Sequence, residues 1–587
     1  MIRGVKKVAE LTPMMQQYMQ TKKEYPDCIL FYRLGDFYEM FFDDAIVASK
    51  ELEIALTGKS CGLEERAPMC GIPYHAVETY LARLVSRGYK VAICEQVEDP
   101  KLAKGLVKRE VIRVVTPGTN LDVQSLEASK NNYLMCIAYT SDGIGISAAD
   151  VTTGDYYVTE VEDLRKLKDE LMKYEPSEII CNEAFLVSGY DVEDLKSRLH
   201  MSVSSLESHM FDDDGCRRIL MRHFKVNTLI GLGVEEFPTG ILAAGALLQY
   251  LYDTQKTDLE HFTHISPYLT SKYMLLDSST RRNLELTETL REKQKRGSLL
   301  WVLDKTKTAM GGRLLRNYIE QPLIDKEEME KRLDAIQELN QDSISRDEIR
   351  EYLNPVYDLE RLLSKVTYKT ANPRDLIAFR NSLQMLPPIK TVLAGFQKEE
   401  LAAIREEIDG LEDIYQLIDE AIVEEPPISI REGGMIKDQF DETIDHLRAA
   451  KHDGKQWLVQ LEEEDRERTG IKNLKIKKNN VFGYFFEVTN SYKDLVPEDY
   501  IRKQTLANAE RYTTPRLKEL EDTILNAEDK LQTLEYDIFC RIRDTIAQEL
   551  VRIQNTAKAL AKLDVYASLS LVSERNHYVR PKLNEKG

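Results

Sequence analysis

The sequence predicts a multidomain protein in which α/β domains are followed by a body of long helices. Three observations support this fold class. With 587 residues, the chain is too long to fold around one hydrophobic core. Strand-like runs alternate with helical patterns over residues 1–255, which is typical of α/β domains. Helical periodicity dominates after residue 256, and a hairpin-like stretch over residues 474–488 interrupts it.

Composition places the chain among ordered globular proteins, because 42% of its residues are hydrophobic and 30% are charged. Its formal net charge of −19 argues against a general polyanion-binding protein. The charge is unevenly distributed: residues 1–120 include 17 basic and 16 acidic residues, and residues 471–517 include nine and five. Any binding of DNA would therefore depend on local basic patches.

The eight cysteines form no C-x-x-C pair and have no histidines at zinc-binding spacing. Scattered thiols of this kind are typical of a reducing cytoplasm. The N-terminus has no apolar segment of the secretory type, and no apolar run is long enough to span a bilayer. The sequence therefore predicts a cytoplasmic protein.

Residues 1–121 have the pattern of a small mixed α/β domain. Its central feature is a strand that begins at Ile29, a Gly35-Asp36 turn, and a second strand that ends at Phe42. The further elements that we expect are a helix capped by Asp43 or Asp44 and ending near Gly58, a helix from about His75 to Gly88, strands Val91–Cys94 and Val111–Val115, and a turn and linker at Thr116-Pro117-Gly118.

Phe37 and Glu39 are the strongest candidate functional residues in this domain. They are two positions apart on a strand, so they project from the same face. An aromatic ring can stack on a nucleobase or wedge between two bases, and a carboxylate can accept a hydrogen bond from a base edge. The alternative for an isolated F-x-E pattern is a core phenylalanine beside a solvated glutamate.

Gly58-Lys59-Ser60 imitates the end of a phosphate-binding P-loop. The full motif requires a glycine five residues before Gly58, where this chain has Glu53. We therefore expect no P-loop here, although Lys59 can reach a phosphate as a surface lysine.

Residues 122–255 predict a second α/β domain with three successive strands and then helices. The strands are Tyr133–Tyr139, Gly143–Val151 and Asp155–Val161, and the helices lie near residues 162–174, 191–200, 214–224 and 239–254. This order is compatible with a ribonuclease-H-like domain. A nuclease of that kind needs clustered acidic metal ligands, and Asp150 has no convincing partners in the sequence.

The later part of the chain predicts a helical arm that carries a small β-structure. A helix over residues 436–468 ends at Gly470, a hairpin follows, and Thr514 with Pro515 starts another helix. No Gly or Pro occurs between Pro515 and Pro581, so we expect one continuous helix there, roughly 90 Å long at ~1.5 Å per residue.

Several ordered motifs resemble the MutS family of DNA mismatch repair proteins. The N-terminal motifs are Tyr32-Arg33-Leu34-Gly35-Asp36-Phe37-Tyr38-Glu39, Gly71-Ile72-Pro73-Tyr74-His75-Ala76, Cys94-Glu95-Gln96 and Arg113-Val114-Val115-Thr116-Pro117-Gly118-Thr119. Those of the helical body are Leu276–Leu286, Gly297–Leu300, Leu303–Gly311, Arg313–Arg316 and Gln321–Leu323. Asn508–Tyr512, before Thr514-Pro515, resembles the family's clamp.

The resemblance implies five segments. They are a mismatch-recognition domain (1–121), a ribonuclease-H-like connector (122–255), a helical core and lever (256–435 and 515–575), a β-containing clamp (436–514) and the start of an ATPase domain (576–587). In the family an ATPase domain with a Walker P-loop follows. We therefore expect this chain to end before it and not to hydrolyse ATP, with ATP and Mg²⁺ bound only where that domain is present.

The resemblance also implies function. Phe37 would stack on a mispaired or unpaired base and kink the duplex, Glu39 would hydrogen-bond that base, and the clamp would hold the DNA backbone. Weaker candidates for DNA contact are Arg33, Asp36, Lys59, Met69, His75, Lys104, Arg113, Thr116, Lys477, Lys478, Asn479, Asn508 and Arg511. The implied partners are mismatched double-stranded DNA, a MutL-type repair protein and a second copy, although dimerisation depends largely on the ATPase domain. The implied location is the bacterial cytoplasm, in association with the nucleoid.

Three alternatives belong to other classes or subfamilies. A metal-dependent nuclease would need a carboxylate cluster near Asp150. A helical scaffold protein would bind no DNA even at low salt. A family relative that acts on recombination junctions is disfavoured, because Phe37 and Glu39 are both present.

Overall fold

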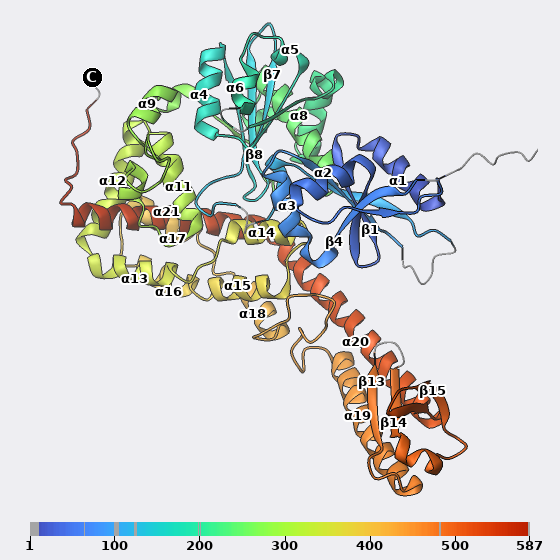
Figure 1. The fold of residues 1–587 in the computed structure, drawn as a ribbon. Coiled ribbons are helices and arrows are strands. Elements are labelled where there is room, and N and C mark those ends of the chain that lie inside the picture. The colour runs from blue at the N-terminus through green and yellow to red at the C-terminus, as the bar shows by residue number, and fades with distance from the viewer. Residues whose placement is uncertain are drawn as a thin grey trace, which may run out of the picture. The chain divides into compact units, whose positions relative to one another are not determined.

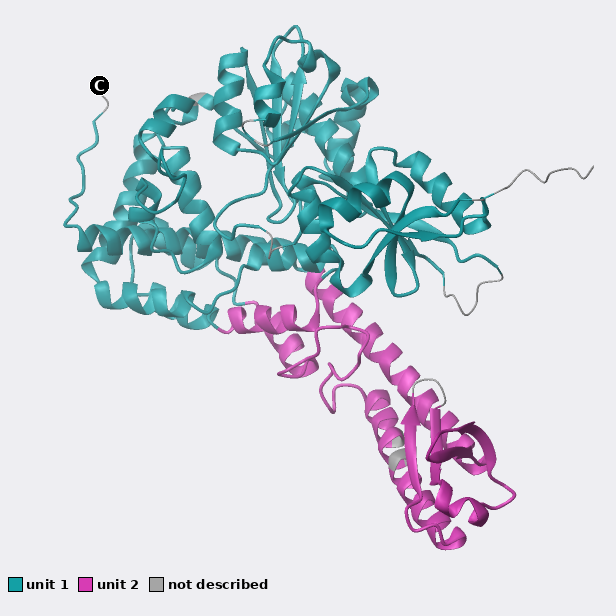
Figure 2. Ribbon diagram, in the orientation of Figure 1, with its two compact units in different colours: residues 1–370, 385–410, 549–587 teal, residues 371–384, 411–548 magenta. Residues whose placement is uncertain are grey.

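The computed structural model describes residues 11–63, 65–98, 105–122, 126–197, 199, 201–479 and 483–584. The chain forms two compact units (Figure 2). Unit 1 contains residues 1–370, 385–410 and 549–587, and unit 2 contains residues 371–384 and 411–548. Among the described residues, no helix has both the length and the apolar character needed to cross a membrane.

The first sheet of unit 1, in which Figure 1 labels β1 and β4, has the strand order β3-β4-β2-β1-β5-β6. Its strands are β1 (Cys28–Leu34), β2 (Phe37–Phe41), β3 (Thr57–Lys59), β4 (Ala67–Pro73), β5 (Lys90–Gln96) and β6 (Arg109–Val115). One face packs on α2 (Phe42–Leu52) and α3 (Val77–Val85), and the other packs on α1 (Pro13–Glu24). All neighbouring strands are antiparallel except β1 and β5.

The predicted hairpin is confirmed. Strands β1 and β2 pair antiparallel with Leu34 opposite Phe37, and Gly35 turns the chain with a φ of +58°. The predicted helix after it is wrong at both ends. It begins at Phe42 without a side-chain cap and ends at Leu52, while Gly58 belongs to β3. Asp44 does not cap it because its carboxylate accepts hydrogen bonds from the Leu30 amide and from Lys22.

The second sheet has the order β11-β10-β7-β8-β9-β12. Its strands are β7 (Leu134–Tyr139), β8 (Ile144–Asp150), β9 (Asp155–Val161), β10 (Glu178–Cys181), β11 (Ser202–Ser205) and β12 (Ser266–Pro267). Strands β7, β8 and β9 are antiparallel, and β10 and β11 continue parallel beside β7. The three predicted strands are confirmed, whereas β10 and β11 were not predicted because each has only four residues.

Helices cover both faces of the second sheet (Figure 1). They are α4 (Leu164–Tyr174), α5 (Glu183–Leu186), α6 (Val192–Ser197), α7 (Asp213–His223) and α8 (Pro238–Gln255), so the predicted helices are confirmed. At one point the backbone of α8 lies directly against the backbone of β8, with no side chain between them. A Cβ on Gly145 of β8 would lie 1.9 Å from the Thr239 carbonyl oxygen, so only glycine fits there.

The segment after β6 is buried and does not form an open linker. Residues Pro117–Thr119 form a 3₁₀ turn, and the hydroxyl of Thr116 donates a hydrogen bond to Glu178 of β10. Thr116 and Glu178 are both fully buried. The turn therefore joins the first sheet to the second through a buried polar contact.

The remaining helices of unit 1 form a body in which α21 (Leu550–Arg575) contacts α10 to α14 and α17, α9 contacts α4, and α16 contacts α13 and α17. They are α9 (Ser278–Asn283), α10 (Leu299–Leu303), α11 (Ala309–Glu320), α12 (Lys326–Gln341), α13 (Ser343–Leu353), α14 (Leu359–Thr367), α16 (Leu386–Leu393) and α17 (Glu399–Glu407). This arrangement confirms the predicted helical body.

Unit 2 is a helical arm that carries a four-stranded sheet of order β13-β14-β16-β15. Its elements are α15 (Pro373–Leu383), α18 (Glu412–Ala421), α19 (Glu442–Thr469), β13 (Lys475–Asn479), β14 (Gly483–Thr489), β15 (Ile501–Thr505), β16 (Ala509–Thr513) and α20 (Pro515–Gln548). One sheet face packs on apolar residues of α19 and α20. As predicted, Gly470 ends α19 in a left-handed conformation, and the Thr514 hydroxyl accepts a hydrogen bond from the Leu517 amide.

Two helix predictions in this region are wrong. Helix α19 begins at Glu442 and not near residue 436, because Ile436 forms a β-bridge with Ile422 and Asp441 caps the helix. The stretch Pro515–Pro581 is not one helix: α20 ends at Gln548 and α21 begins at Leu550.

Candidate nucleic-acid interface

The Phe37 ring lies at the surface of the first sheet. It is 47% exposed, although β2 is an interior strand between β1 and β4. Neither of the two hydrophobic clusters that cover this sheet includes it. The alternative of a core phenylalanine is therefore wrong, and the ring is available to a ligand.

Glu39 lies two residues further along β2, on the same face. Its carboxylate Oε2 is 2.5 Å from the Nζ of Lys59 on β3. The Glu39 side chain is 17% exposed and that of Lys59 is 34% exposed. The ammonium of Lys59 also lies 5.5 Å from the centre of the Phe41 ring, a distance at which a cation is attracted to the ring. The pair is therefore ordered and only partly hydrated.

Gly71 on β4 lies opposite Glu39. A Cβ added there would be 3.5 Å from Cγ of Glu39 and 3.9 Å from Cδ1 of Phe37. The missing side chain thus leaves room for a methyl group beside the exposed ring and the carboxylate, and we call this small space the notch. Gly71 could not be identified as part of the site from the sequence. A glycine in a strand usually signals a bulge or a close backbone approach, and it does not indicate which side chains lie beside it.

Polar and aromatic side chains on the other face of the hairpin hold its turn. The Arg33 guanidinium stacks 3.9 Å above the Tyr74 ring, and its Nε donates to the carbonyl of Gly35 at 2.5 Å. Tyr38 donates a hydrogen bond to Glu95, and burial raises the pKa of Tyr38 well above its ordinary value. These contacts fix the turn that precedes Phe37.

The other candidates of the first domain occupy varied positions. Asp36 is exposed in the turn, and its carbonyl accepts from the Tyr74 amide at 3.0 Å. Met69 is half-buried on the same face as Gly71, and His75 is exposed beside Tyr74. Lys104 lies outside the described residues.

Arg113 and Thr116 are not brought to Phe37. Arg113 is half-buried on β6, which β1 and β5 separate from β2, and it donates to the Thr119 carbonyl at 3.1 Å. Burial lowers its pKa. Thr116 is fully buried against Glu178. Both side chains connect parts of unit 1 in this structure.

The candidate clamp residues lie on the sheet of unit 2. Alternation places Lys475, Lys477 and Arg511 on the face away from the apolar packing against α19 and α20. Lys477 is 2.7 Å from Glu487, and Arg511 donates to Gln504 at 2.8 Å. We call this surface the outer face of the unit 2 sheet, defined by Lys475, Lys477, Phe485, Glu487 and Arg511.

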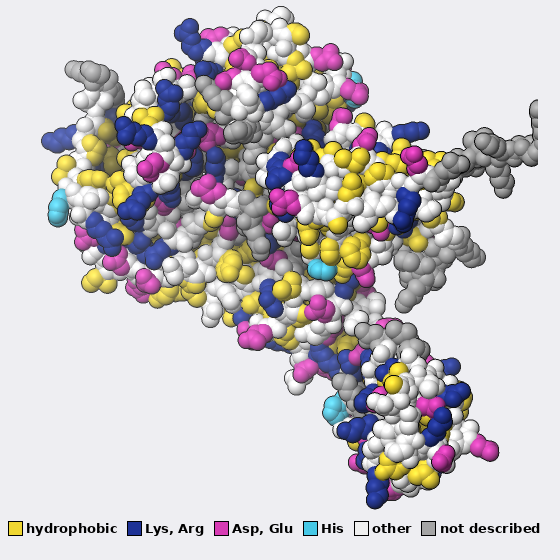
Figure 3. Space-filling model, viewed as in Figure 1, with side chains coloured by type: hydrophobic (Ala, Val, Ile, Leu, Met, Phe, Trp, Pro, Cys, Tyr) yellow, Lys and Arg dark blue, Asp and Glu magenta, His cyan; other side chains and the backbone are white. Residues whose placement is uncertain are grey.

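The remaining clamp candidates lie around that face. Lys478 belongs to the opposite side, where its Nζ is 3.5 Å from Glu528 of α20. Asn479 pairs with Gly483 at the end of the β13–β14 ladder, and Asn508 is exposed before β16. Figure 3 shows Lys and Arg side chains interspersed with Asp and Glu over this sheet-bearing end of unit 2. The outer face is therefore basic but partly neutralised.

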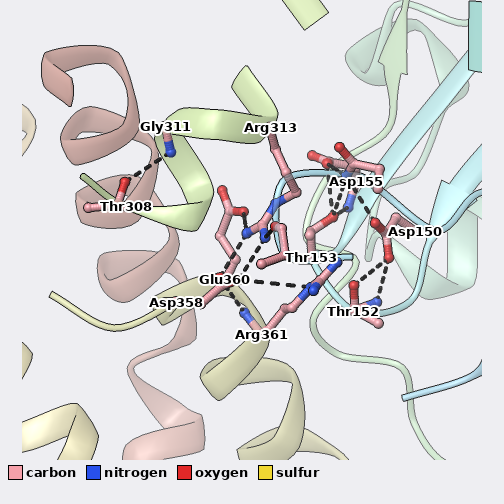
Figure 4. A network of polar contacts seen from close by, with 12 residues as sticks. Asp150, Thr152, Thr153, Asp155, Thr308, Gly311, Arg313, Asp358, Glu360 and Arg361 are labelled. Atoms are coloured by element: carbon pink, nitrogen blue, oxygen red, sulfur yellow. Dashed lines mark hydrogen bonds and ion pairs between the residues drawn. The ribbon is translucent and has the colours of Figure 1, made fainter. Parts of the chain in front are cut away.

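Asp150, the key residue of the nuclease alternative, is a structural acid (Figure 4). It is fully buried. One oxygen accepts from the amide and hydroxyl of Thr152, at 2.8 and 2.7 Å, and the other from Asn131 and the Asn132 amide, at 2.9 and 3.0 Å. No group of three or more His, Cys, Asp or Glu suited to a metal ion occurs in the described part of the chain.

The same close-up includes ion pairs of α11 and α14. Arg313 binds Asp358 and Glu360, each at 2.6 Å, while Arg361 donates at 2.8 Å to the backbone carbonyl of Lys130. Burial raises the pKa of Glu360 to about 7, and the charge of Arg313 opposes that shift. The bond from Arg361 joins the segment before β7 to the helical body.

Comparison with known proteins identifies three family models in this chain. MutS domain I matches residues 12–124, MutS domain II residues 132–265 and MutS domain III residues 279–570. The matches follow one another along the chain and span both sheets of unit 1 and the sheet of unit 2.

Curated relatives are similar over nearly the whole chain. The DNA mismatch repair protein MutS of Lachnoclostridium phytofermentans is 65% identical over 99% of this chain and 62% of its own length. Those of Ruminiclostridium cellulolyticum and Acetivibrio thermocellus are 54% and 52% identical over 98% of this chain and 66% of their lengths. The chain thus spans somewhat less than two thirds of these relatives, and it belongs to the MutS family of DNA mismatch repair proteins.

Proposed function

We propose that this chain binds duplex DNA at mispaired or unpaired bases. The observation that carries the proposal is the exposed Phe37 ring beside Glu39, with no side chain on Gly71 between them. The ring stacks on a disturbed base and kinks the duplex. Unstacking a step costs a few kcal/mol, and the cost is lowest where pairing is already lost. Selectivity thus comes from deformability and not from a base sequence.

Glu39 accepts a hydrogen bond from the displaced base, or shares a proton with it. The outer face of the unit 2 sheet contacts DNA phosphates through Lys475, Lys477 and Arg511, independently of sequence. Asp36, Met69 and His75 are closer to Phe37 in the fold than Arg113 and Thr116 are, so we favour them as further DNA contacts.

The second domain is proposed to be a ribonuclease-H-like connector without nuclease activity. The antiparallel order of β7, β8 and β9, with β10 and β11 parallel beside β7, supports this description. The buried, fully hydrogen-bonded Asp150 argues against a catalytic role. For the whole protein we propose a MutL-type partner and a second copy of the chain.

The test is Phe37→Ala, measured by fluorescence anisotropy with a paired duplex and with the same duplex containing a G·T pair or an unpaired base. Base–aromatic stacking contributes about 1–3 kcal/mol per base, so affinity for the mismatched duplex should fall about 5- to 150-fold. Binding to the paired duplex should remain. The matched control is Ile112→Ala on β6, because Ile112 is also 47% exposed on the same sheet. Persistent mismatch preference in Phe37→Ala would refute the proposal.

A further inference from the structure

Glu39, which is proposed to accept a hydrogen bond from a base, is already paired with Lys59 in this structure. A base that binds Glu39 meets a carboxylate already bonded to an ammonium at 2.5 Å. Among the described residues, Glu39 is the only carboxylate paired with Lys59. A change at one partner therefore alters the charge that the other presents.

Lys59 neutralises an acid at a surface where DNA phosphates would approach. A bare carboxylate would repel them, and this repulsion is stronger at a partly buried site than in bulk water. Lys59 lies on β3, the edge strand of the sheet, and its side chain retains 34% exposure. It is thus placed to bind either Glu39 on its inner side or a phosphate on its outer side.

We infer that Lys59 exchanges partners when a disturbed base binds. On a paired duplex no base leaves the stack, so Glu39 keeps Lys59. On a mismatched duplex the displaced base donates a hydrogen bond to Glu39, and Lys59 is released to a backbone phosphate. The inference rests on the proposed function. Lys59 is then a positioning residue, and the chain contacts one more phosphate on mismatched DNA than on paired DNA.

Salt dependence measures this difference directly. Each phosphate neutralised by a protein cation steepens the slope of log affinity against log salt by about 0.9 on B-DNA. We therefore expect the slope for mismatched DNA to be steeper than that for the same duplex fully paired, by about 0.9. If Lys59 stays with Glu39 throughout, the two slopes will be equal.

Variants assign the effect to this pair. Lys59→Met should equalise the two slopes and lower mismatch affinity about fivefold, within the range for loss of a single phosphate contact. Lys59→Arg retains the charge and should preserve the slope difference. Glu39→Gln frees Lys59 on every duplex, so affinity for paired DNA should rise and its slope should steepen by about 0.9. Lys166→Met is the matched control, because Lys166 on α4, in the second domain, forms a 2.7 Å pair with Glu162 just before that helix.

The outcomes separate the two ideas. If the wild-type chain shows no preference for the mismatched duplex, the proposed function and the exchange both fail. If the preference is present but the slopes are already equal, or Lys59→Met leaves a difference in place, the exchange fails and the proposed function stands. Slopes that differ in the wild-type chain and in Lys59→Arg, but not in Lys59→Met, establish the exchange.

Discussion

Two lysine–glutamate pairs occur on two different sheets of this molecule, and their surroundings differ. Lys59 and Glu39 lie 2.5 Å apart on the first sheet of unit 1, and Lys477 and Glu487 lie 2.7 Å apart on the unit 2 sheet. Each glutamate is largely shielded, with side-chain exposures of 17% and 23%. The ion pairs themselves therefore do not distinguish the two sites.

The neighbouring aromatic rings do. Beside Glu39 the Phe37 ring is 47% exposed and Gly71 leaves a notch. Beside Glu487 the Phe485 ring is 1% exposed, and the Arg511 guanidinium lies 4.4 Å from its centre. An uncovered ring can stack on a base, whereas an arginine over a ring presents charge to a phosphate. The two sites therefore differ in whether the aromatic ring is exposed. An exposed ring suits contact with a base, and a ring under an arginine suits contact with a phosphate, while the ion pairs are alike.

The strongest test of this distinction is the double variant Lys475→Met, Lys477→Met. Loss of two phosphate contacts should weaken binding to paired and mismatched duplexes alike, about 25-fold at 0.1 M salt, and should reduce both salt slopes by about 1.8. The ratio of the two affinities should not change. Anisotropy titrations at three salt concentrations measure all of these quantities. A selective loss of mismatch binding would show that the outer face of the unit 2 sheet also reads bases.

A smaller effect is expected from Gly71→Ala. The added Cβ would meet its neighbours at 3.4 Å or more, so the sheet should tolerate it. It would nevertheless occupy the notch between Phe37 and Glu39, and we expect mismatch affinity to fall about fivefold, comparable with losing part of one stacking contact. Affinity for paired DNA should be unchanged. Equal losses on both duplexes would indicate a distorted sheet, which a thermal melt of the variant would reveal.

The smallest expected effect is from Glu487→Gln. Without the carboxylate, Lys477 and Arg511 present more positive charge, so affinity for every duplex should rise about threefold, as expected for a pair worth under 1 kcal/mol. The ratio of the mismatched to the paired affinity distinguishes the sites, because we expect Glu39→Gln to reduce it while Glu487→Gln preserves it. A fall in affinity on Glu487→Gln would mean that the carboxylate orients these cations and does not restrain them.

Local patterns made the hairpin of the first domain predictable. A Gly-Asp turn between two runs of strand-forming residues gives the register, and the two-residue spacing of Phe37 and Glu39 gives their common face. The partner of Glu39 was not predictable. Lys59 is 20 residues away and belongs to a three-residue strand, and β4 separates it from β2.

Tertiary contacts account for the predictions that failed. Asp44 has the sequence position of a helix cap, but its carboxylate bonds Lys22 and the Leu30 amide. Thr116 reads as part of an exposed turn, yet Glu178 of the next domain buries it. The helix break at Glu549 could not be predicted, because no glycine or proline occurs there. For Asp44 and Thr116, residues distant in sequence decided the outcome.

The contact between Gly145 and Thr239 has a mechanical consequence. The backbones of β8 and α8 touch there, with no flexible side chain between them. Helix α8 therefore cannot slide along β8 unless the two first separate. The close backbone contact thus sets the position of α8 along β8. A substitution at Gly145 would therefore force α8 away from β8 and loosen the face of the sheet that this helix covers.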